Sequence, residues 1–195
     1  MSPVRTALLV AALAAAGAAQ WVDAAQKPKA YTAPEAFTSP LQAHSKSGSA
    51  AATIRIQIDR YTPEHARTTM TDGLKYNGYP GFLRALRDAP PAGTLTVAGQ
   101  EFKIRWARQV PNEKGRTISL VTDKPVFFIG MQRKDAPPTA GYEVAVVQLV
   151  FDSAGKGTGT MAAAARVKRD GETGVKLDTY ADNPLTLTAT VRSGR

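Results

Sequence analysis

The sequence predicts an α+β domain in which two N-terminal helices pack on a largely antiparallel, meander-type sheet of about seven to nine strands. Three observations predict this class. Apolar residues alternate with a period of two over residues 53–59, which indicates a half-buried strand. The pattern is helical between residues 62 and 89. After Gly93, alternating segments separated by Gly, Pro, Asn and Asp continue to the C-terminus, which indicates successive strands.

The N-terminus has the pattern of a cleavable signal peptide. A short basic start ends at Arg5, and an apolar run rich in Ala, Leu and Val follows over residues 6–16. Small residues predict cleavage after Ala18 or after Ala24, so we interpret residues 1–24 as the signal peptide. Because no Arg-Arg pair precedes the run, we expect export by the general secretory route to the periplasm or the extracellular space.

The next segment is rich in Ala, Pro, Ser, Thr, Gly and Lys and shows no sustained periodicity. We therefore interpret residues 25–51 as a flexible linker and residues 52–195 as a single α+β domain. The apolar run near the N-terminus is too short to cross a bilayer comfortably, so no transmembrane segment is expected in the mature protein.

The first elements of the domain have clear signals. Ile54, Ile56 and Ile58 share one face of the first strand. Thr62 is the expected cap of a helix whose first residue is Pro63. The buried stripe of that helix is predicted to be Ala66, Met70 and Leu74.

The first helix is expected to end at Asn77-Gly78, and a second one to begin at Pro80 and end before Pro90. Thr94 to Val97 then alternate as a strand. In the next strand, Phe102, Ile104 and Trp106 fall on one face, which places Trp106 in the core. A turn at 111–115 connects this strand to another that carries Ile118 and Leu120.

Two segments, 126–131 and 142–151, are apolar on both faces and are the expected central strands. Further strands are predicted at 158–168, 174–180 and 185–192. The turns between them are expected at 153–157, 170–171 and 182–184, where Gly, Asp, Asn and Pro gather.

The composition excludes several kinds of site. With no cysteine, the chain has no disulfide, thiolate metal site, iron–sulfur cluster or cysteine nucleophile. His44 and His65 are the only histidines and lack metal-ligand spacing, so we expect neither a metal nor a cofactor. The net charge of +9 favours an anionic partner, either an envelope polymer or lipid headgroups. No specific nucleic-acid binding is expected.

Two motifs have both a functional and a structural interpretation. Asp59, Glu64 and His65 bracket a strand-to-helix turn where they could act in acid–base chemistry, but helix initiation already explains Glu64. The run Gly155 to Thr160 resembles a phosphate loop, but its lysine precedes the second glycine and strand residues follow. We therefore predict a hairpin turn there.

A basic face is the best candidate for a binding site. The residues that lie in or near the hairpin after residue 100 and carry positive charge are Lys103, Arg105, Arg108, Arg116 and Lys124. Strand alternation places Lys103 and Arg105 opposite the apolar face. The alternative interpretation is an ordinary solvated sheet face.

Four motifs together resemble a group of uncharacterised secreted bacterial proteins. They are the runs Ile58 to Glu64, Gly93 to Leu95, Arg105 to Arg108 and Leu120 to Pro125. The likeness extends from about residue 53 to the C-terminus. It implies export and one domain, and it implies no activity and no catalytic residues.

Three functions fit these observations. The first is a noncatalytic binding or accessory protein of the cell envelope or extracellular space, which the export signal, the basic charge and the lack of a catalytic motif favour. The second is a secreted hydrolase with a carboxylate-based site that the sequence does not expose. The third is a carrier that holds an apolar ligand between helices and sheet, near Phe127, Phe128, Met131 and Met161.

Overall fold

The computed structural model describes residues 32–45, 48–112, 115–126, 141–170, 174–179 and 185–193. The described chain is mostly β, with one helical element. In chain order the elements are β1 (Glu35–Ser45), β2 (Gly48–Ile58), α1 (Glu64–Asp88), β3 (Gly93–Val97), β4 (Gln100–Asn112), β5 (Gly115–Thr122), β6 (Val144–Asp152), β7 (Gly157–Asp170), β8 (Gly174–Thr179) and β9 (Leu185–Arg192).

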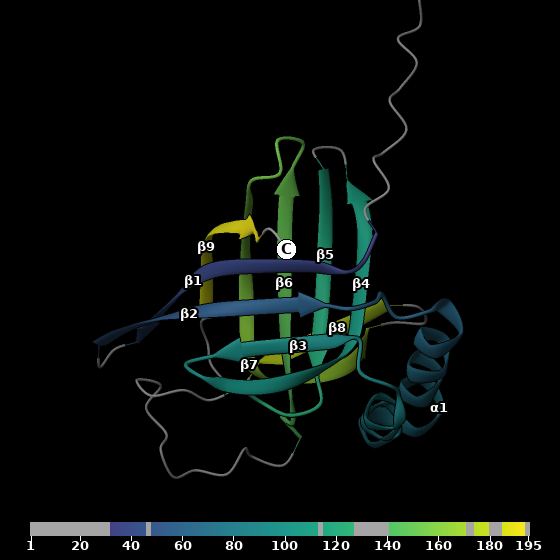
Figure 1. The fold of residues 1–195 in the computed structure, drawn as a ribbon. Coiled ribbons are helices and arrows are strands. Elements are labelled where there is room, and N and C mark those ends of the chain that lie inside the picture. The colour runs from purple at the N-terminus through teal and green to yellow at the C-terminus, as the bar shows by residue number, and fades with distance from the viewer. Residues whose placement is uncertain are drawn as a thin grey trace, which may run out of the picture.

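Eight of the strands form a closed antiparallel barrel. Consecutive strands from β1 to β6 pair as a meander, and β9 lies between β1 and β7. Pairing of β6 with β7 closes the ring. Figure 1 shows β1, β2 and β3 running across the front while β4, β5 and β6 stand behind them at a steep angle. The sheet therefore curls back on itself.

The ninth strand lies outside the ring and depends on the length of β7. The first part of β7 pairs with β6 and β9, whereas residues 165–170 pair with β8. β8 thus extends the sheet beyond the barrel, beside the part of β7 that does not pair with β9.

The antiparallel meander and the packing of helices against it are confirmed, but the single sheet layer expected beneath them is wrong. The sheet closes on itself and the helical element packs on its outside. Alternation along each strand reports that one face is buried. It does not report that β9 pairs with both β1 and β7, which joins the first strand to the last ones, so closure could not be inferred from local patterns.

The predicted linker over residues 25–51 is wrong for β1 and for the start of β2. Glu35, Phe37, Ser39 and Leu41 alternate as buried residues of β1. Two of these four side chains are polar, and Pro40 follows Ser39. The period-two hydrophobic signal was therefore too weak to identify a strand.

The barrel interior is filled by side chains that alternate along the strands. Ile54, Ile56 and Ile58 of β2 point inward, as predicted, and each is at most 2% exposed. They pack in one cluster with residues from the other barrel strands, among them Phe37, Leu95, Leu120, Leu149 and Met161. This packed interior is the main hydrophobic core.

The two predicted helices are the two halves of α1. Gly78 has φ 64° and ψ −161°, a conformation that L-residues avoid, and the chain reverses there. Met70 and Leu74 of the first half are buried as predicted, together with Phe82 and Leu86 of the second. They form a second apolar cluster against the outer face of the barrel.

The predicted helix cap is wrong. The helix begins at Glu64 without a side-chain cap. The Thr62 Oγ1 atom instead accepts a hydrogen bond from the Ala107 N–H at 2.8 Å, and the Thr62 N–H donates to the Ala107 carbonyl. Thr62 therefore fastens the chain to β4 before the helix starts.

Trp106 was also placed on the wrong face. A register irregularity between Ile104 and Trp106 shifts the alternation of β4. Ile104 and Ala107 point into the barrel, whereas Trp106 packs in the outer cluster with α1. A bulge of this kind leaves no period-two signature in one sequence.

The other strand predictions are confirmed where the structure describes them, and the turn at 153–157 joins β6 to β7. The run Gly155 to Thr160 is accordingly a hairpin turn and the start of β7. Residues 1–24, 127–131, 171 and 182–184 lie outside the described residues. In the described chain, no helix has the length and apolar character needed to cross a membrane.

Candidate functional site

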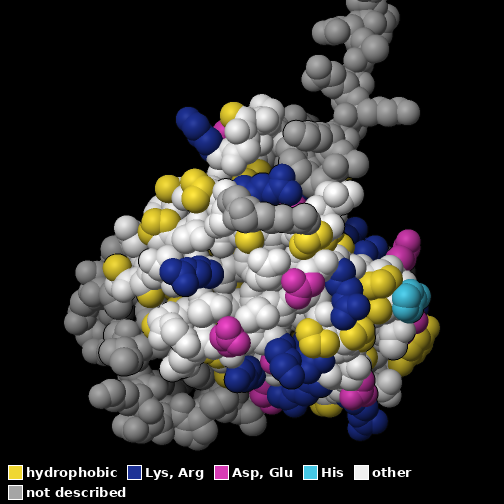
Figure 2. Space-filling model, viewed as in Figure 1, with side chains coloured by type: hydrophobic (Ala, Val, Ile, Leu, Met, Phe, Trp, Pro, Cys, Tyr) yellow, Lys and Arg dark blue, Asp and Glu magenta, His cyan; other side chains and the backbone are white. Residues whose placement is uncertain are grey.

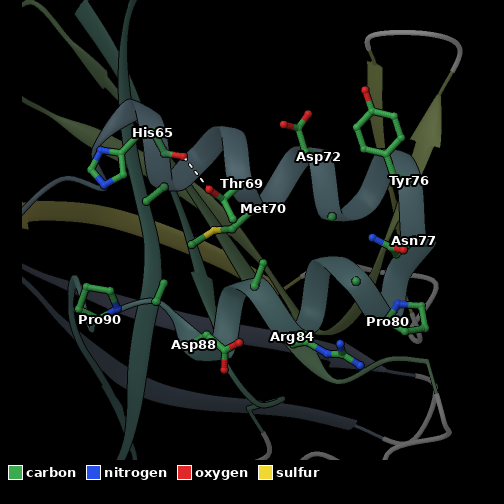
Figure 3. A pocket seen from close by; sticks show the side chains of 15 residues that line it. His65, Thr69, Met70, Asp72, Tyr76, Asn77, Pro80, Arg84, Asp88 and Pro90 are labelled. Carbon is green, nitrogen blue, oxygen red and sulfur yellow. Dashed lines mark hydrogen bonds between the residues drawn. The ribbon is translucent and has the colours of Figure 1, made fainter.

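A groove separates the two halves of α1 on the solvent side of the helical hairpin (Figure 3). Its volume is about 670 Å³. Two glycines let the helical halves approach closely, because a Cβ on Gly73 would lie 2.7 Å from the Gly81 carbonyl oxygen and one on Gly81 would lie 2.5 Å from the Gly73 oxygen. The floor of the groove is therefore formed by backbone and small side chains.

Polar side chains line the groove from both sides. In Figure 3, His65, Asp72 and Tyr76 belong to the first half of α1, and Arg84 and Asp88 belong to the second. This set can donate and accept hydrogen bonds around a small ligand lying on the glycine floor.

The predicted acid–base set does not form a single cluster. Asp59 accepts a hydrogen bond from Gln57 Nε2 at 3.3 Å. Glu64 lies exposed in the first turn of α1, where its charge favours the helix start. His65 lines the groove. The three side chains thus take part in separate local arrangements.

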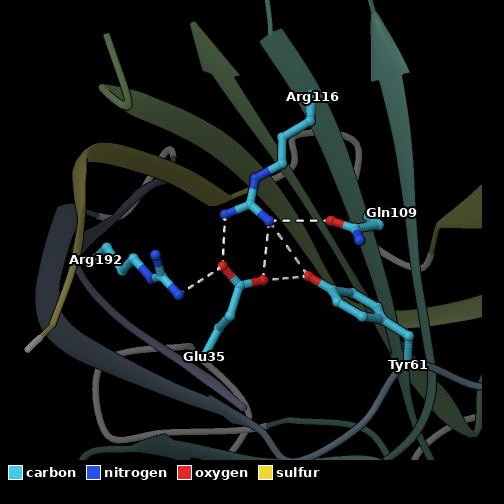
Figure 4. A network of polar contacts seen from close by, with 5 residues as sticks. All are labelled: Glu35, Tyr61, Gln109, Arg116 and Arg192. Atoms are coloured by element: carbon cyan, nitrogen blue, oxygen red, sulfur yellow. Dashed lines mark hydrogen bonds and ion pairs between the residues drawn. The ribbon is translucent and has the colours of Figure 1, made fainter. Parts of the chain in front are cut away.

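A second polar site closes one end of the barrel, which we call the mouth network. It consists of Glu35, Tyr61, Gln109, Arg116 and Arg192 (Figure 4). Arg116 Nη2 lies 2.8 Å from Glu35 Oε1, and Arg116 Nη1 lies 2.9 Å from Glu35 Oε2. This fork-to-fork pair is strong and directional.

The other members of the mouth network complete the hydrogen bonding of this pair. Arg116 Nη1 also donates to Gln109 Oε1 at 3.0 Å, and the Tyr61 hydroxyl donates to Glu35 Oε2. The Arg116 guanidinium lies 5.8 Å from the Phe37 ring and 5.3 Å from the Phe151 ring. Both aromatic faces favour the cation.

The electrostatics keep the mouth network in one protonation state. Burial alone would raise the pKa of Glu35, but the hydrogen bonds from Arg116 and Tyr61 and the charges of Arg116 and Arg192 hold it below its ordinary value. Burial and the neighbouring Glu35 raise the pKa of Tyr61 well above its usual range. Glu35 stays ionised and Tyr61 stays protonated near neutral pH. The arrangement therefore suits a structural clasp better than proton transfer.

Three of the five predicted anion-binding residues gather beside the end of α1. Lys103 and Lys124 are exposed, and Arg105 is partly buried. Arg105 Nε lies 3.1 Å from Asp123 Oδ2, and the Asp123 N–H donates to the Lys103 carbonyl. Lys124 Nζ lies 5.2 Å from the centre of the Phe102 ring, and Phe102 directly precedes Lys103 in the chain. Arg105 is thus paired with the Asp123 carboxylate, whereas Lys103 adjoins Asp123 through its backbone and Lys124 follows it in the chain.

Arg87, which the sequence analysis did not select, joins this group. It lies in the last turn of α1, and its Nε donates to the Asp123 carbonyl at 3.4 Å. We call Arg87, Lys103, Arg105 and Lys124 the basic patch. With Asp123 included, its formal charge is +3, from four cations and one carboxylate. Figure 2 shows Lys and Arg side chains gathered between β3 and α1.

The remaining two predicted residues lie elsewhere. Arg108 is exposed on β4, opposite Ser119 of β5 and on the far side of Trp106 from Lys103. Arg116 points into the barrel and belongs to the mouth network, with a side chain only 6% exposed. The prediction of one basic face is therefore wrong for Arg116, which shares the inward phase of Ile118 and Leu120 on β5.

Arg105 has a structural task within the patch. Its Nη1 atom donates to the carbonyl of Ala89, the residue that caps the C-terminal end of α1. Cations at this helix end are also favoured by the helix dipole. Arg87 and Arg105 each donate to a backbone carbonyl. Among the described interactions, the side chains of Lys103 and Lys124 make no such contact.

The candidates of the carrier hypothesis are not brought together around a cavity. Met161 is fully buried in the barrel core. Phe127, Phe128 and Met131 lie outside the described residues. In the described ranges, the space between α1 and the barrel is filled by residues of the outer apolar cluster, such as Leu74, Phe82 and Val121.

Comparison of the chain with protein-family models, with curated proteins and with solved structures finds no match. Within the described residues, no three His, Asp or Glu side chains converge as they would around a metal ion. The function is therefore inferred from the geometry of the three sites.

Proposed function

We propose that the protein is an exported, noncatalytic binding protein that holds an anionic polymer of the cell envelope on the basic patch. The observation that carries this proposal is that four basic residues from α1, β4 and the chain after β5 meet at Asp123: Arg105 pairs with its carboxylate, Arg87 and Lys103 contact its backbone, and Lys124 follows it in the chain. Because a polymer presents repeated negative groups, several cations in a fixed arrangement can bind it together and release its counterions. The signal-peptide pattern and the resemblance to secreted bacterial proteins support export.

The other sites favour binding over catalysis. Glu35 is the fully buried carboxylate of the described chain, and Arg116 and Tyr61 already use both of its oxygens. A general acid would need a raised pKa and access to a substrate. Glu35 has the opposite shift and no exposed surface.

A polymer fits the patch better than a membrane surface does. Peripheral proteins gain membrane affinity by inserting apolar side chains beside their cations. Among the described residues, the exposed large apolar side chains are Tyr76, Val110, Val150, Leu177 and Val191. None of them neighbours Lys103 or Lys124 in sequence or strand register.

Retention experiments with charge-matched variants test the proposal. The variant Lys103→Glu with Lys124→Glu should elute from immobilised heparin at much lower salt than the wild type. The control, Lys75→Glu with Lys156→Glu, changes the net charge equally at exposed positions on α1 and on the β6–β7 turn, so its loss should be smaller. Equal losses in both variants would show that only net charge matters and would contradict the proposal.

A parallel measurement separates the two sources of negative charge. Cosedimentation with anionic phospholipid vesicles should be weak at a salt concentration where inorganic polyphosphate still binds. Strong, patch-dependent binding to the vesicles alone would replace the polymer with a lipid surface as the partner.

A second candidate function, binding of a small ligand that carries hydrogen-bonding groups, is favoured by the groove in α1. Its volume of about 670 Å³ lies in the range of small-molecule sites. Replacing Ala85, which lines the groove, by Trp should fill the space. Mass spectrometry that finds the same copurifying compound on the wild type and on Ala85→Trp would exclude the groove as its site.

A further inference from the structure

Charged residues are distributed unevenly around the barrel. On β5, β6, β9 and residues 157–165 of β7, the sequence has only three: Arg116, Asp152 and Arg192. Both arginines point to Glu35 in the mouth network. Asp152 lies at the β6–β7 turn, where its Oδ1 accepts the Lys156 N–H. Between these ends, the outward side of the four strands carries no charge.

The strand register arranges the outward residues into a continuous neutral face. Ser119 of β5 lies opposite Gln148 of β6, which lies opposite Thr160 of β7 and then Thr186 of β9. Val150 lies opposite Thr158 in the adjacent row. We call these six residues the neutral face. Val150 is 44% exposed, and Gln148, Thr158, Thr160 and Thr186 are exposed as well.

The neutral face is centred on strands that carry no residue of the basic patch, and it borders the outer apolar cluster that packs against α1. In the ring of eight strands, β7 is four strands from β3 in either direction. The basic patch lies beside β3, on β4 and at the end of β5, and α1 contributes Arg87 to it. A partner that covers the neutral face therefore contacts mainly β6, β7 and β9, which carry none of the patch residues.

We propose that the neutral face binds a second copy of this chain. Two copies that each carry a net charge of +9 repel one another, so contact is most favourable through a face without charge. A twofold contact brings the same patch of both copies together, and hydroxyl and amide groups are self-complementary because each donates and accepts. No charge has to be desolvated in this contact.

The size of the face sets the strength of association. Four strands spaced about 4.8 Å apart make a surface only about 15–20 Å wide, which is smaller than a standard interface. We therefore expect a weak dimer that forms with rising protein concentration. Added salt should strengthen it, because salt screens the repulsion between the two basic copies.

Sedimentation velocity over a range of protein and salt concentrations tests this proposal. Thr160→Lys should shift dimerisation to concentrations about tenfold higher or more, because it places like charges in the contact. The matched control is Thr96→Lys, which adds the same charge on β3 between Arg55 and Glu101 and should have a much smaller effect. A monomer at all concentrations, equal effects of both variants, or dissociation by salt would overturn the proposal.

Single cysteines provide a second test that does not depend on a lysine being tolerated. Because the chain has no cysteine, each substitution introduces the only thiol. Gln148→Cys and Thr160→Cys should give a disulfide-linked dimer on mild oxidation, whereas Thr96→Cys should give far less. Similar yields at all three positions would indicate random collision and contradict a specific face. Neither test uses the basic patch, so both are independent of the proposed function.

Discussion

Arg116 and Glu35 form a buried bidentate ion pair that joins β5 to the first residue of β1, with Nη2 and Oε1 2.8 Å apart. The side chain of Glu35 is fully buried and that of Arg116 is 6% exposed. Such a pair costs desolvation energy, so its value depends on complete hydrogen bonding. Tyr61 and Gln109 provide that completion. The pair closes the barrel end at which β1 begins.

Removing one partner of this pair should be more harmful than removing both. Arg116→Met leaves Glu35 buried without its main cation, which should lower the free energy of unfolding by about 3–5 kcal/mol. The double variant Glu35→Met with Arg116→Met leaves no uncompensated charge and should recover a large part of this loss. Urea denaturation measures both values. A double variant that is less stable than Arg116→Met alone would show that the pair does not act as a unit.

Acid should weaken the barrel through Glu35. Since the folded-state pKa of Glu35 lies below its ordinary value of 4.5, ionised Glu35 stabilises the fold above about that pH. This contribution is lost as the pH falls through the folded-state pKa. Glu35→Gln should therefore be less stable than the wild type at neutral pH. Its free energy of unfolding should fall less between about pH 5 and about pH 2, the window in which the wild-type carboxylate is protonated. Parallel curves for wild type and variant in that window would contradict this role.

β1 should behave as part of the core. Leu41→Ala removes a fully buried side chain and should lower the free energy of unfolding by about 2–5 kcal/mol. Its neighbour Gln42 is exposed, so Gln42→Ala should change stability by less than about 0.5 kcal/mol. Thermal or urea denaturation measures both. If neither Leu41→Ala nor Gln42→Ala changed the free energy of unfolding, the interpretation of this segment as a linker would be restored.

The helical hairpin should depend on its glycine contact. Gly81→Ala places a Cβ about where the Gly73 carbonyl oxygen approaches, 2.5 Å away, so the halves of α1 must separate. We expect a loss of about 1–3 kcal/mol, typical of overpacking. Lys75→Ala, at an exposed position of the same helix, is the control and should be nearly neutral. If Gly81→Ala stabilised the protein, as alanine does in an isolated helix, the close approach would be refuted.

The strands were predictable where hydrophobic and polar residues alternate strictly. Ile54, Ile56 and Ile58 show this pattern, and so do Leu95 and Val97. β1 escaped notice because Glu35 and Ser39 occupy inward positions that apolar residues usually fill. Their burial is explained only by distant partners, Arg116 and the β9 residues Thr188 and Thr190. Barrel closure and the mouth network depend on such long-range contacts, which one sequence does not reveal.

The basic patch was predictable in part for a similar reason. Lys103 is outward by strand alternation, and Lys124 follows a strand end, so both could be selected locally. Arg87 is far from them in sequence and joins them only because α1 ends beside Asp123. Arg116, by contrast, is in phase with the inward residues Ile118 and Leu120, and it is paired with Glu35 inside the barrel.

The most direct test of polymer binding by the basic patch is the salt dependence of affinity for inorganic polyphosphate, measured by isothermal titration. The proposal predicts that log affinity falls steeply with log salt concentration for the wild type and for Lys75→Glu with Lys156→Glu. It also predicts that Lys103→Glu with Lys124→Glu binds more weakly and has a distinctly shallower slope, because fewer counterions are released. Identical slopes and affinities for the two charge-matched variants would contradict a specific role of the basic patch.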